Sequence, residues 1–192
     1  KRKELCKLAE YNLKDSELCY RLGKILFPQI VELSRLVGQL PFDTSRMTYS
    51  QLVEWYLTKK AVRMGYLIPN QPTWEKIAKR RVKPRYIGGF VKEPIGGIHE
   101  NIAVVDFRSL YPSIIASMNI SPETLNKGSK KDGFVVPGSK NWFCKRPKGF
   151  VSSVIRGLIE KRQEIKKEMK RVSGEKRKLL DLRQKSIKTV SN

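Results

Sequence analysis

The amino-acid sequence predicts an α+β fold in which long helices flank a small sheet. Apolar residues recur at steps of three and four over residues 1–37 and again over residues 151–192, which is the spacing of amphipathic helices. Between them, residues 98–105 contain the apolar, β-branched run that is typical of a short strand. We therefore expect N-terminal helices, a central part with a partial sheet, and a C-terminal helical hairpin.

The N-terminal helical pattern contains two features of interest. Pro28 lies inside it, so we expect either a kink or a break into two helices. Tyr11 and Asp15 are four residues apart and therefore share one helix face. On spacing alone, a pair at the protein surface is the simplest interpretation.

A second helix and a basic segment are predicted to follow. Ser45 can cap a helix that ends at Gly65. Residues 76–85 carry six Lys and Arg and have little apolar content. We therefore expect this segment to be exposed and mobile.

Two glycine pairs precede the predicted strand. Gly88 and Gly89 allow the backbone to approach a partner closely, and their amides can face a phosphate. A β-bulge or a hairpin turn is the alternative explanation of this pair. Gly96 and Gly97 predict a hairpin turn directly before the strand.

The central stretch joins the predicted strand to a helix. Residues 102–105 are expected to be buried in a sheet, Asp106 follows where the strand should emerge, and Pro112 can open a helix. This arrangement would hold a carboxylate at the rim of a sheet, where Mg²⁺ acting on a phosphate can use it. An aspartate that merely caps the helix explains the same spacing, and both interpretations stay open.

The composition favours an anionic partner. The 192 residues include 40 Lys and Arg against 18 Asp and Glu, a formal net charge of +22. Nucleic acid is the partner that such an excess most favours, with a membrane surface as the weaker alternative. No apolar run is long enough to span a bilayer, so we expect no membrane partner. Cys6, Cys19 and Cys144 show no paired spacing and are typical of free thiols in the cytoplasm.

The C-terminal region is predicted to fold back on itself at a tight turn formed by Ser173 and Gly174. Arg162 and Lys166 are four residues apart, as are Gln184 and Lys188. If the two helices pair, position 162 lies level with 184, and the three cations converge on one flank. An arginine fork with two lysines suits a nucleoside triphosphate. A solvated pair of basic helices is the alternative.

Longer motifs decide between these alternatives. Residues 106–115, DFRSLYPSII, resemble motif A of the family B DNA polymerases, and residues 180–192 resemble their motif B as far as Asn192. Further matches are Tyr11 with Asp15 (third exonuclease motif), Tyr86 to Gly89 (Tyr-x-Gly-Gly element) and residues 162–166 (finger helix). From end to end, the chain resembles an archaeal family B DNA polymerase.

The resemblance implies three parts of such an enzyme. Residues 1–37 would be the C-terminal helices of a 3′–5′ exonuclease domain and its linker. Residues 38–150 would form the N-terminal portion of the palm, with part of its sheet. Residues 151–192 would be the helical hairpin of the fingers, truncated within motif B.

The resemblance also implies an activity and residue roles. The activity would be template-directed nucleotidyl transfer with two Mg²⁺ ions and a dNTP substrate, accompanied by 3′–5′ proofreading. Asp106 would be catalytic and would bind metal with the Phe107 carbonyl, while Tyr11 and Asp15 would serve the exonuclease site, Asp15 as a metal ligand. The nucleotide would contact Ser109, Leu110, Tyr111, Arg162, Lys166, Lys188 and Asn192. DNA would contact Tyr86, Gly88 and Gly89.

The implied partners are primer–template DNA, a sliding clamp, and a second polypeptide or chain segment with the rest of the palm and the thumb. Without that piece, which would bring the second palm aspartates, we expect no activity. We expect the chain to be nucleoid-associated and to be part of something longer. Asn192 matches an intein insertion point or a split-gene boundary, and proteolysis or truncation is the alternative. The competing function is a non-catalytic basic nucleic-acid-binding relative of the polymerases.

Overall fold

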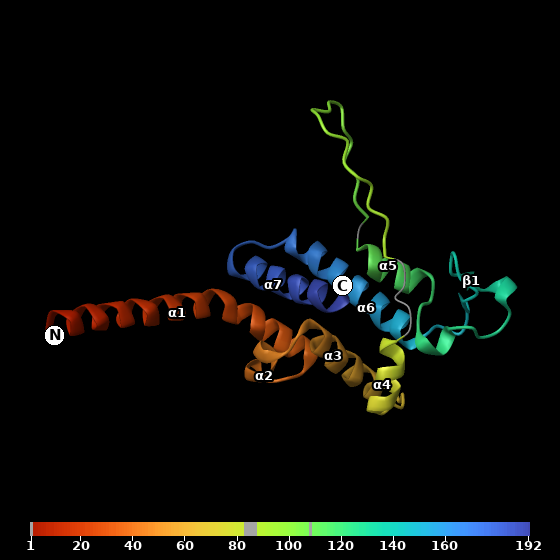
Figure 1. Ribbon diagram of the computed structural model, residues 1–192, viewed down its shortest axis with the longest axis horizontal. Helices are drawn as coiled ribbons and strands as arrows, with labels where there is room; N and C mark the ends of the chain where they lie inside the picture. The colour runs from red at the N-terminus through yellow and green to blue at the C-terminus, as the bar shows by residue number, and fades with distance from the viewer. Residues whose placement is uncertain (1, 83–87, 108) are drawn as a thin grey trace.

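The structure is a computed structural model that describes residues 2–82, 88–107 and 109–192. It is mostly helical (Figure 1). The helices are α1 (Arg2–Val37), α2 (Pro41–Arg46), α3 (Tyr49–Arg63), α4 (Trp74–Arg81), α5 (Leu110–Ser117), α6 (Phe150–Met169) and α7 (Gly174–Ser191). Two 3₁₀ turns, Pro122–Thr124 and Lys130–Asp132, precede the strands β1 (Phe134–Val135) and β2 (Trp142–Phe143). The strands pair antiparallel, with Phe134 opposite Phe143.

Helix α1 is continuous through Pro28, so the expected alternative of two separate helices is wrong. Residues 2–28 are all exposed, and Figure 1 shows this part of α1 extending away from the other helices. From Gln29 onward the helix contacts α7, α2 and α3, and Val37 is buried. These tertiary contacts stabilise the turns next to the proline, which would otherwise be the weakest part of the helix.

The core lies where α6 and α7 pair and meet α1, α3 and α5. The predicted helical hairpin is confirmed: α6 and α7 run side by side in Figure 1 and make the most extensive contact in the described chain. Leu158 of α6 is 2% exposed at the centre of the cluster. The buried apolar residues of this cluster are Val37, Leu52, Tyr56, Ala116, Val154, Ile155, Leu158, Ile165, Leu180, Ile187 and Val190.

The N-cap of α3 differs from the predicted residue. Thr48, not Ser45, caps α3: its hydroxyl accepts the Gln51 N–H (3.3 Å), and the Gln51 side chain accepts the Thr48 N–H (2.8 Å). Ser45 lies inside α2 and donates to the Phe42 carbonyl. The predicted end of the helix at Gly65 is confirmed, because Gly65 follows α3 with a φ of +72°.

The basic segment contains a helix that its composition does not predict. Most of its described part is the helix α4, which is exposed along most of its length. Glu75 in its first turn pairs with Lys79, four residues later, at 2.7 Å. Residues 83–85 of the segment lie outside the described residues.

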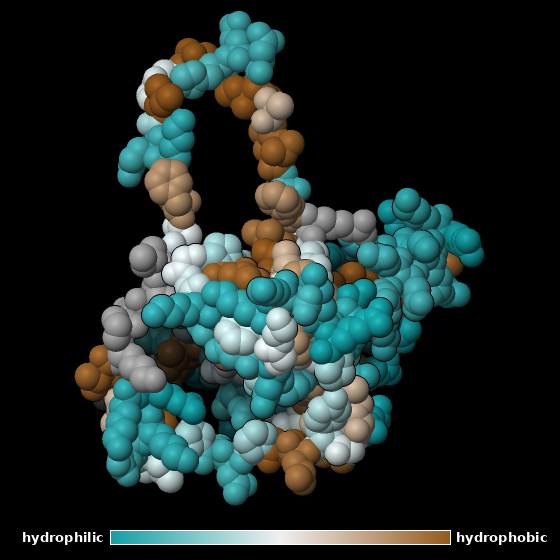
Figure 2. All heavy atoms as spheres, turned by 90° about the vertical axis from the view of Figure 1, so that its right-hand side faces the viewer, coloured by the Kyte–Doolittle hydropathy of each residue, from teal (hydrophilic) through white to brown (hydrophobic). Residues whose placement is uncertain are grey.

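The predicted buried strand is absent from the structure. Residues 88–107 form an extended arm without assigned strands, and Val104 and Val105 are 91% and 92% exposed. The arm reverses near Gly97, which has a φ of +121°, as the glycine pair predicted. Figure 2 shows the arm standing clear of the body, with hydrophobic and hydrophilic residues along it. A strand is stable only beside hydrogen-bonding neighbours, and the arm has none among the described residues.

Asn119 organises the segment between α5 and α6. It is fully buried and has a φ of +54°. Its amide group donates to the carbonyls of Cys144 (2.7 Å) and Pro147 (2.9 Å). Its side-chain oxygen accepts the Gly149 N–H (2.8 Å) and the Ser152 hydroxyl (2.7 Å). One side chain thus joins the end of α5 to the start of α6 and fixes their relative position.

Among the described residues, no helix combines the length and apolar content that a membrane crossing needs.

Candidate functional site

A small pocket of about 50 Å³ lies between α6 and the start of α5. Two cations of α6 and two serines near the start of α5 are on its wall. The lining residues are Ser109, Ser113, Ile159, Arg162, Gln163, Lys166 and Ser191. Because helix α6 places Arg162 and Lys166 one turn apart, both reach the same space. The pocket therefore combines positive charge with hydroxyl groups, which suits an anionic ligand.

Arg162 is oriented by two hydrogen bonds. Its Nε donates to the Gln184 side-chain oxygen on α7 (3.1 Å), and its Nη1 donates to the Ser109 hydroxyl (3.3 Å). The expected alignment of positions 162 and 184 is therefore confirmed. Gln184 in turn donates to Asp181 (2.9 Å), whose pKa is lowered by hydrogen bonds from Lys185 and then from Gln184 itself. A charged Asp181 therefore stabilises the orientation of Gln184 toward Arg162.

Ser109 introduces the second element of the pocket. It is the N-cap of α5 and adopts a left-handed conformation with φ +51° and ψ +56°. That conformation is unfavourable for a residue with a Cβ, and such positions concentrate at functional sites. Leu110 and Tyr111 lie in the first turn of α5, and Tyr111 is 71% exposed. Ser109, at the start of α5, thus approaches the cations of α6.

The predicted metal ligands lie at the base of the arm. Asp106 and Phe107 are both exposed there, and Asp106 lies three residues before Ser109 in the sequence. The described residues contain no group of three His, Cys, Asp or Glu side chains that could hold a metal ion. Asp106 is an oxygen donor of the kind that Mg²⁺ takes, but one carboxylate does not make a complete site.

The other predicted site residues are not gathered at the pocket. Tyr11 and Asp15 are exposed on the extending half of α1, away from α6 (Figure 1). Gly88 and Gly89 lie exposed in the arm, and Tyr86 is outside the described residues. Lys188 is exposed on α7 and lies outside the set of lining residues. The structure therefore places Arg162, Lys166 and Ser109 at one pocket, and the roles of all the predicted site residues stay predictions.

Sequence reasoning missed two polar residues, Asp181 beside this site and Asn119 between α5 and α6. Asp181 orients Gln184. It lies three residues before Gln184 and four before Lys185, so helical spacing could have identified it as their partner. Asn119 has no such signal, because its partners are backbone groups scattered over residues 144–149.

Residues 44–192 match the family model described as DNA polymerase family B. The chain belongs to this family. It is 44% identical over 191 residues to a DNA polymerase of Pyrococcus glycovorans, covering 99% of this chain and 24% of that protein. It is 46% identical over 187 residues to a DNA polymerase of Thermococcus gorgonarius, covering 97% of this chain and again 24% of the relative.

The likeness extends to three-dimensional structure. The family B DNA polymerase from the hyperthermophilic archaeon Pyrobaculum calidifontis superposes with a TM-score of 0.76 at 31% identity. That match covers 96% of this chain and 24% of the other. The chain therefore spans about a quarter of the length of each of these three relatives. The predicted family is confirmed.

Proposed function

We propose that the chain forms part of a DNA-directed DNA polymerase that carries out template-directed nucleotidyl transfer. The observation that carries the proposal is the hydrogen bond from Arg162 to Ser109. These residues are 53 positions apart. Ser109 belongs to the motif A match and Arg162 to the finger-helix match, and the proposed function requires these two segments to meet. Membership of DNA polymerase family B supports the same function.

The proposal divides the chain into three parts. Residues 1–37 belong to the end of a 3′–5′ exonuclease domain, residues 38–150 to the palm, and residues 151–192 to the fingers. The exposed apolar side chains of the arm and of the first half of α1 support this division, because they offer surfaces on which further parts of a polymerase can pack. The relatives' greater length is consistent with such parts.

Arg162 and Lys166 are proposed to bind the triphosphate of an incoming dNTP, with Lys188 approaching from α7. An arginine with two hydrogen-bonded nitrogens is already oriented, so little conformational entropy is lost when it binds a phosphate. Ser109 and Leu110 would contribute the backbone near the phosphates. Tyr111 would lie under the sugar, where its bulk excludes a 2′-hydroxyl. Asn192 would lie near the nascent base pair.

Asp106 and the Phe107 carbonyl are proposed as the ligands that this chain supplies to two Mg²⁺ ions. When bound, the ions would stabilise the charge that develops on the phosphate oxygens. We propose that a second polypeptide or chain segment supplies the other carboxylate ligands, and we expect no activity without it. Tyr11 and Asp15 are likewise proposed as one part of a proofreading site. Primer–template DNA, held in part by Tyr86, Gly88 and Gly89, and a sliding clamp complete the proposed partners.

A non-catalytic nucleic-acid-binding role is the second candidate, and the net charge of +22 favours it. Primer extension separates the two. The chain is combined with a polypeptide that carries the rest of the palm and the thumb, and nucleotide incorporation is measured beside DNA binding. We expect incorporation by the combination and none by Asp106→Asn, with DNA binding kept in both. Binding without incorporation by the unaltered combination would favour the non-catalytic role, and incorporation by Asp106→Asn would exclude Asp106 as a metal ligand.

A further inference from the structure

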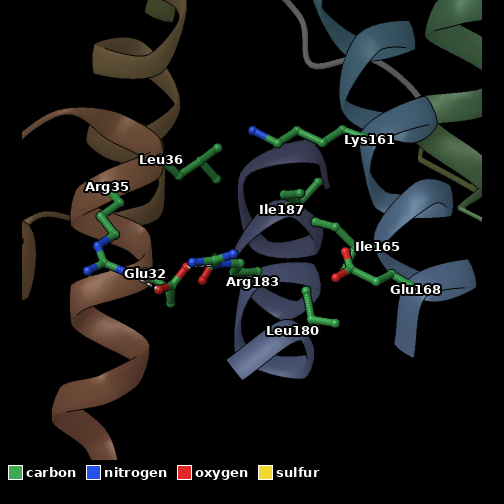
Figure 3. A pocket seen from close by; sticks show the side chains of 10 residues that line it. Glu32, Arg35, Leu36, Lys161, Ile165, Glu168, Leu180, Arg183 and Ile187 are labelled. Carbon is green, nitrogen blue, oxygen red and sulfur yellow. Dashed lines mark hydrogen bonds and ion pairs between the residues drawn. The ribbon is translucent and has the colours of Figure 1, made fainter. Parts of the chain in front are cut away.

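Helix α1 is tied to α7 by a buried carboxylate (Figure 3). The Glu32 side chain is 5% exposed, and each of its oxygens accepts a hydrogen bond from an arginine. Arg35 of α1 approaches Oε1 at 2.8 Å, and Arg183 of α7 approaches Oε2 at 3.0 Å. Nearby, the Gln29 amide donates to the buried Ser186 hydroxyl at 2.7 Å. The Glu32–Arg183 and Gln29–Ser186 hydrogen bonds each join residues about 150 positions apart in the sequence.

The space beside this link is not filled. A pocket of about 310 Å³ lies between α1, α6 and α7. Figure 3 shows Glu32 between Arg35 and Arg183 on one side of it, with apolar side chains of α6 and α7 on the other. Because close packing is interrupted there, the position of α7 relative to α1 depends more strongly on the polar contacts than it would in a continuous core.

The link is adjacent in sequence to the contact that orients Arg162. Arg183 bonds Glu32 on α1, and the next residue, Gln184, bonds Arg162 on α6. A shift of α7 away from α1 therefore moves the Gln184 side chain relative to Arg162. The buried carboxylate is thus connected to Arg162 through two hydrogen bonds made by neighbouring residues of α7.

We propose that Glu32 is a positioning residue for nucleotide binding. It holds α7 where Gln184 presents its side-chain oxygen to Arg162, and it thereby sets the affinity of the proposed site for the triphosphate. This role rests on the proposed polymerase function. It concerns residues of α1 that lie outside the pocket and outside the motifs that suggested that function.

A purely structural role makes a different prediction. Loss of a buried ion pair lowers the free energy of unfolding, whether or not the pair also orients other residues. Only a positioning role changes the KM for dNTP in protein that is fully folded at the assay temperature. The ratio of the effect on KM to the effect on kcat therefore separates the two roles.

The test uses the polymerase assembled from this chain and the remaining palm and thumb. We expect Glu32→Gln to raise the KM for dNTP roughly three- to tenfold and to change kcat by less than about twofold, the scale on which residues that couple two elements act. Arg183→Gln should have the same effect. The double variant should be no worse than either single one, because both remove the same contact. Thermal unfolding of each variant shows whether it is folded at the assay temperature.

Glu175→Gln is the matched control, because it removes the Lys178–Glu175 pair (2.9 Å) within α7 and no contact to α1. Its KM should stay within about twofold of the parent value. An unchanged KM in folded Glu32→Gln, or additive effects in the double variant, would overturn the role of Glu32. If Glu32→Gln does not fold, Arg183→Gln decides alone, since Arg183 is partly exposed. Absence of incorporation by the unaltered enzyme would instead contradict the polymerase function itself.

Discussion

Asn119 connects three segments of backbone from a position without solvent contact. Four hydrogen bonds depend on its side chain. Asn119→Ala would leave buried carbonyl and N–H groups without partners, and we expect it to lower the free energy of unfolding by about 2–4 kcal/mol. Urea unfolding followed by circular dichroism measures this change.

The matched control is Asn141→Ala. Asn141 is exposed, and its side-chain oxygen accepts a hydrogen bond from the Asn126 amide group at 2.9 Å. Its replacement should change the free energy of unfolding by no more than about 0.5 kcal/mol. Equal losses in the two variants would mean that Asn119 does not organise this segment.

Glu123 adds a pH dependence at the start of α6. Burial acts to raise its pKa, but hydrogen bonds from the N–H groups of Phe150 and Glu123 and from the Ser121 hydroxyl outweigh burial, so the pKa lies below its ordinary value of 4.5. A lowered folded-state pKa stabilises the fold above pH 4.5 and ceases to do so as the pH falls through the folded-state value.

Glu123→Gln should therefore lower the melting temperature at pH 7, and the difference from the parent protein should shrink as the pH falls below the ordinary pKa of 4.5. Thermal unfolding of both proteins across this pH range measures the difference. Glu54→Gln, at an exposed position of α3, is the control. A difference that stayed constant with pH would show that the Glu123 carboxylate is not involved.

At the scale of elements, the arm is the part whose structure depends most on what surrounds it. Its valines are exposed in this chain, and its backbone lacks ladder partners among the described residues. We expect amides of residues 98–105 to exchange rapidly with solvent in the isolated chain and to become protected when the rest of the palm is added. Hydrogen exchange followed by mass spectrometry measures this. Amides of α6 near Leu158 should be protected in both samples, and continued rapid exchange of the arm would contradict its proposed place in the palm.

The elements also show what a sequence can predict. The α6–α7 hairpin follows from local periodicity, and so does the alignment of Arg162 with Gln184. The prediction of a buried strand at residues 102–105 was wrong for this chain. The apolar pattern is typical of a buried strand, but it does not specify which segment provides the neighbouring strand. The choice of Thr48 over Ser45 as a cap depends on where α2 ends, which the composition of the turn does not specify.

The candidate site was predictable to a similar extent. Ser109, Arg162 and Lys166 were expected from motifs, and they line one pocket. The direct bond between Arg162 and Ser109 was not expected, since it depends on the left-handed backbone of Ser109, for which a serine gives no signal. The buried link at Glu32 joins two distant helices, and each of its residues is an ordinary charged side chain in sequence.

At the scale of the whole molecule, the charge of +22 determines how the chain should meet nucleic acid. Each phosphate that the protein neutralises releases counterions, so affinity for DNA should fall steeply with salt. We expect the logarithm of the association constant to fall linearly with the logarithm of salt concentration, with a slope of about −4 or steeper. Fluorescence anisotropy with labelled duplex DNA measures this slope. A slope near zero would contradict a phosphate-binding surface.

The central claim is that the cations of α6 and the segment from Asp106 to Tyr111 form one nucleotide site. The most direct test compares the KM for dNTP of Arg162→Gln and Lys167→Gln in the assembled polymerase. Both variants remove one positive charge from α6, but only Arg162 lines the pocket and bonds Ser109. We predict that Arg162→Gln raises the KM about 10- to 100-fold and that Lys167→Gln changes it by less than about twofold. Equal effects of the two substitutions would contradict the claim.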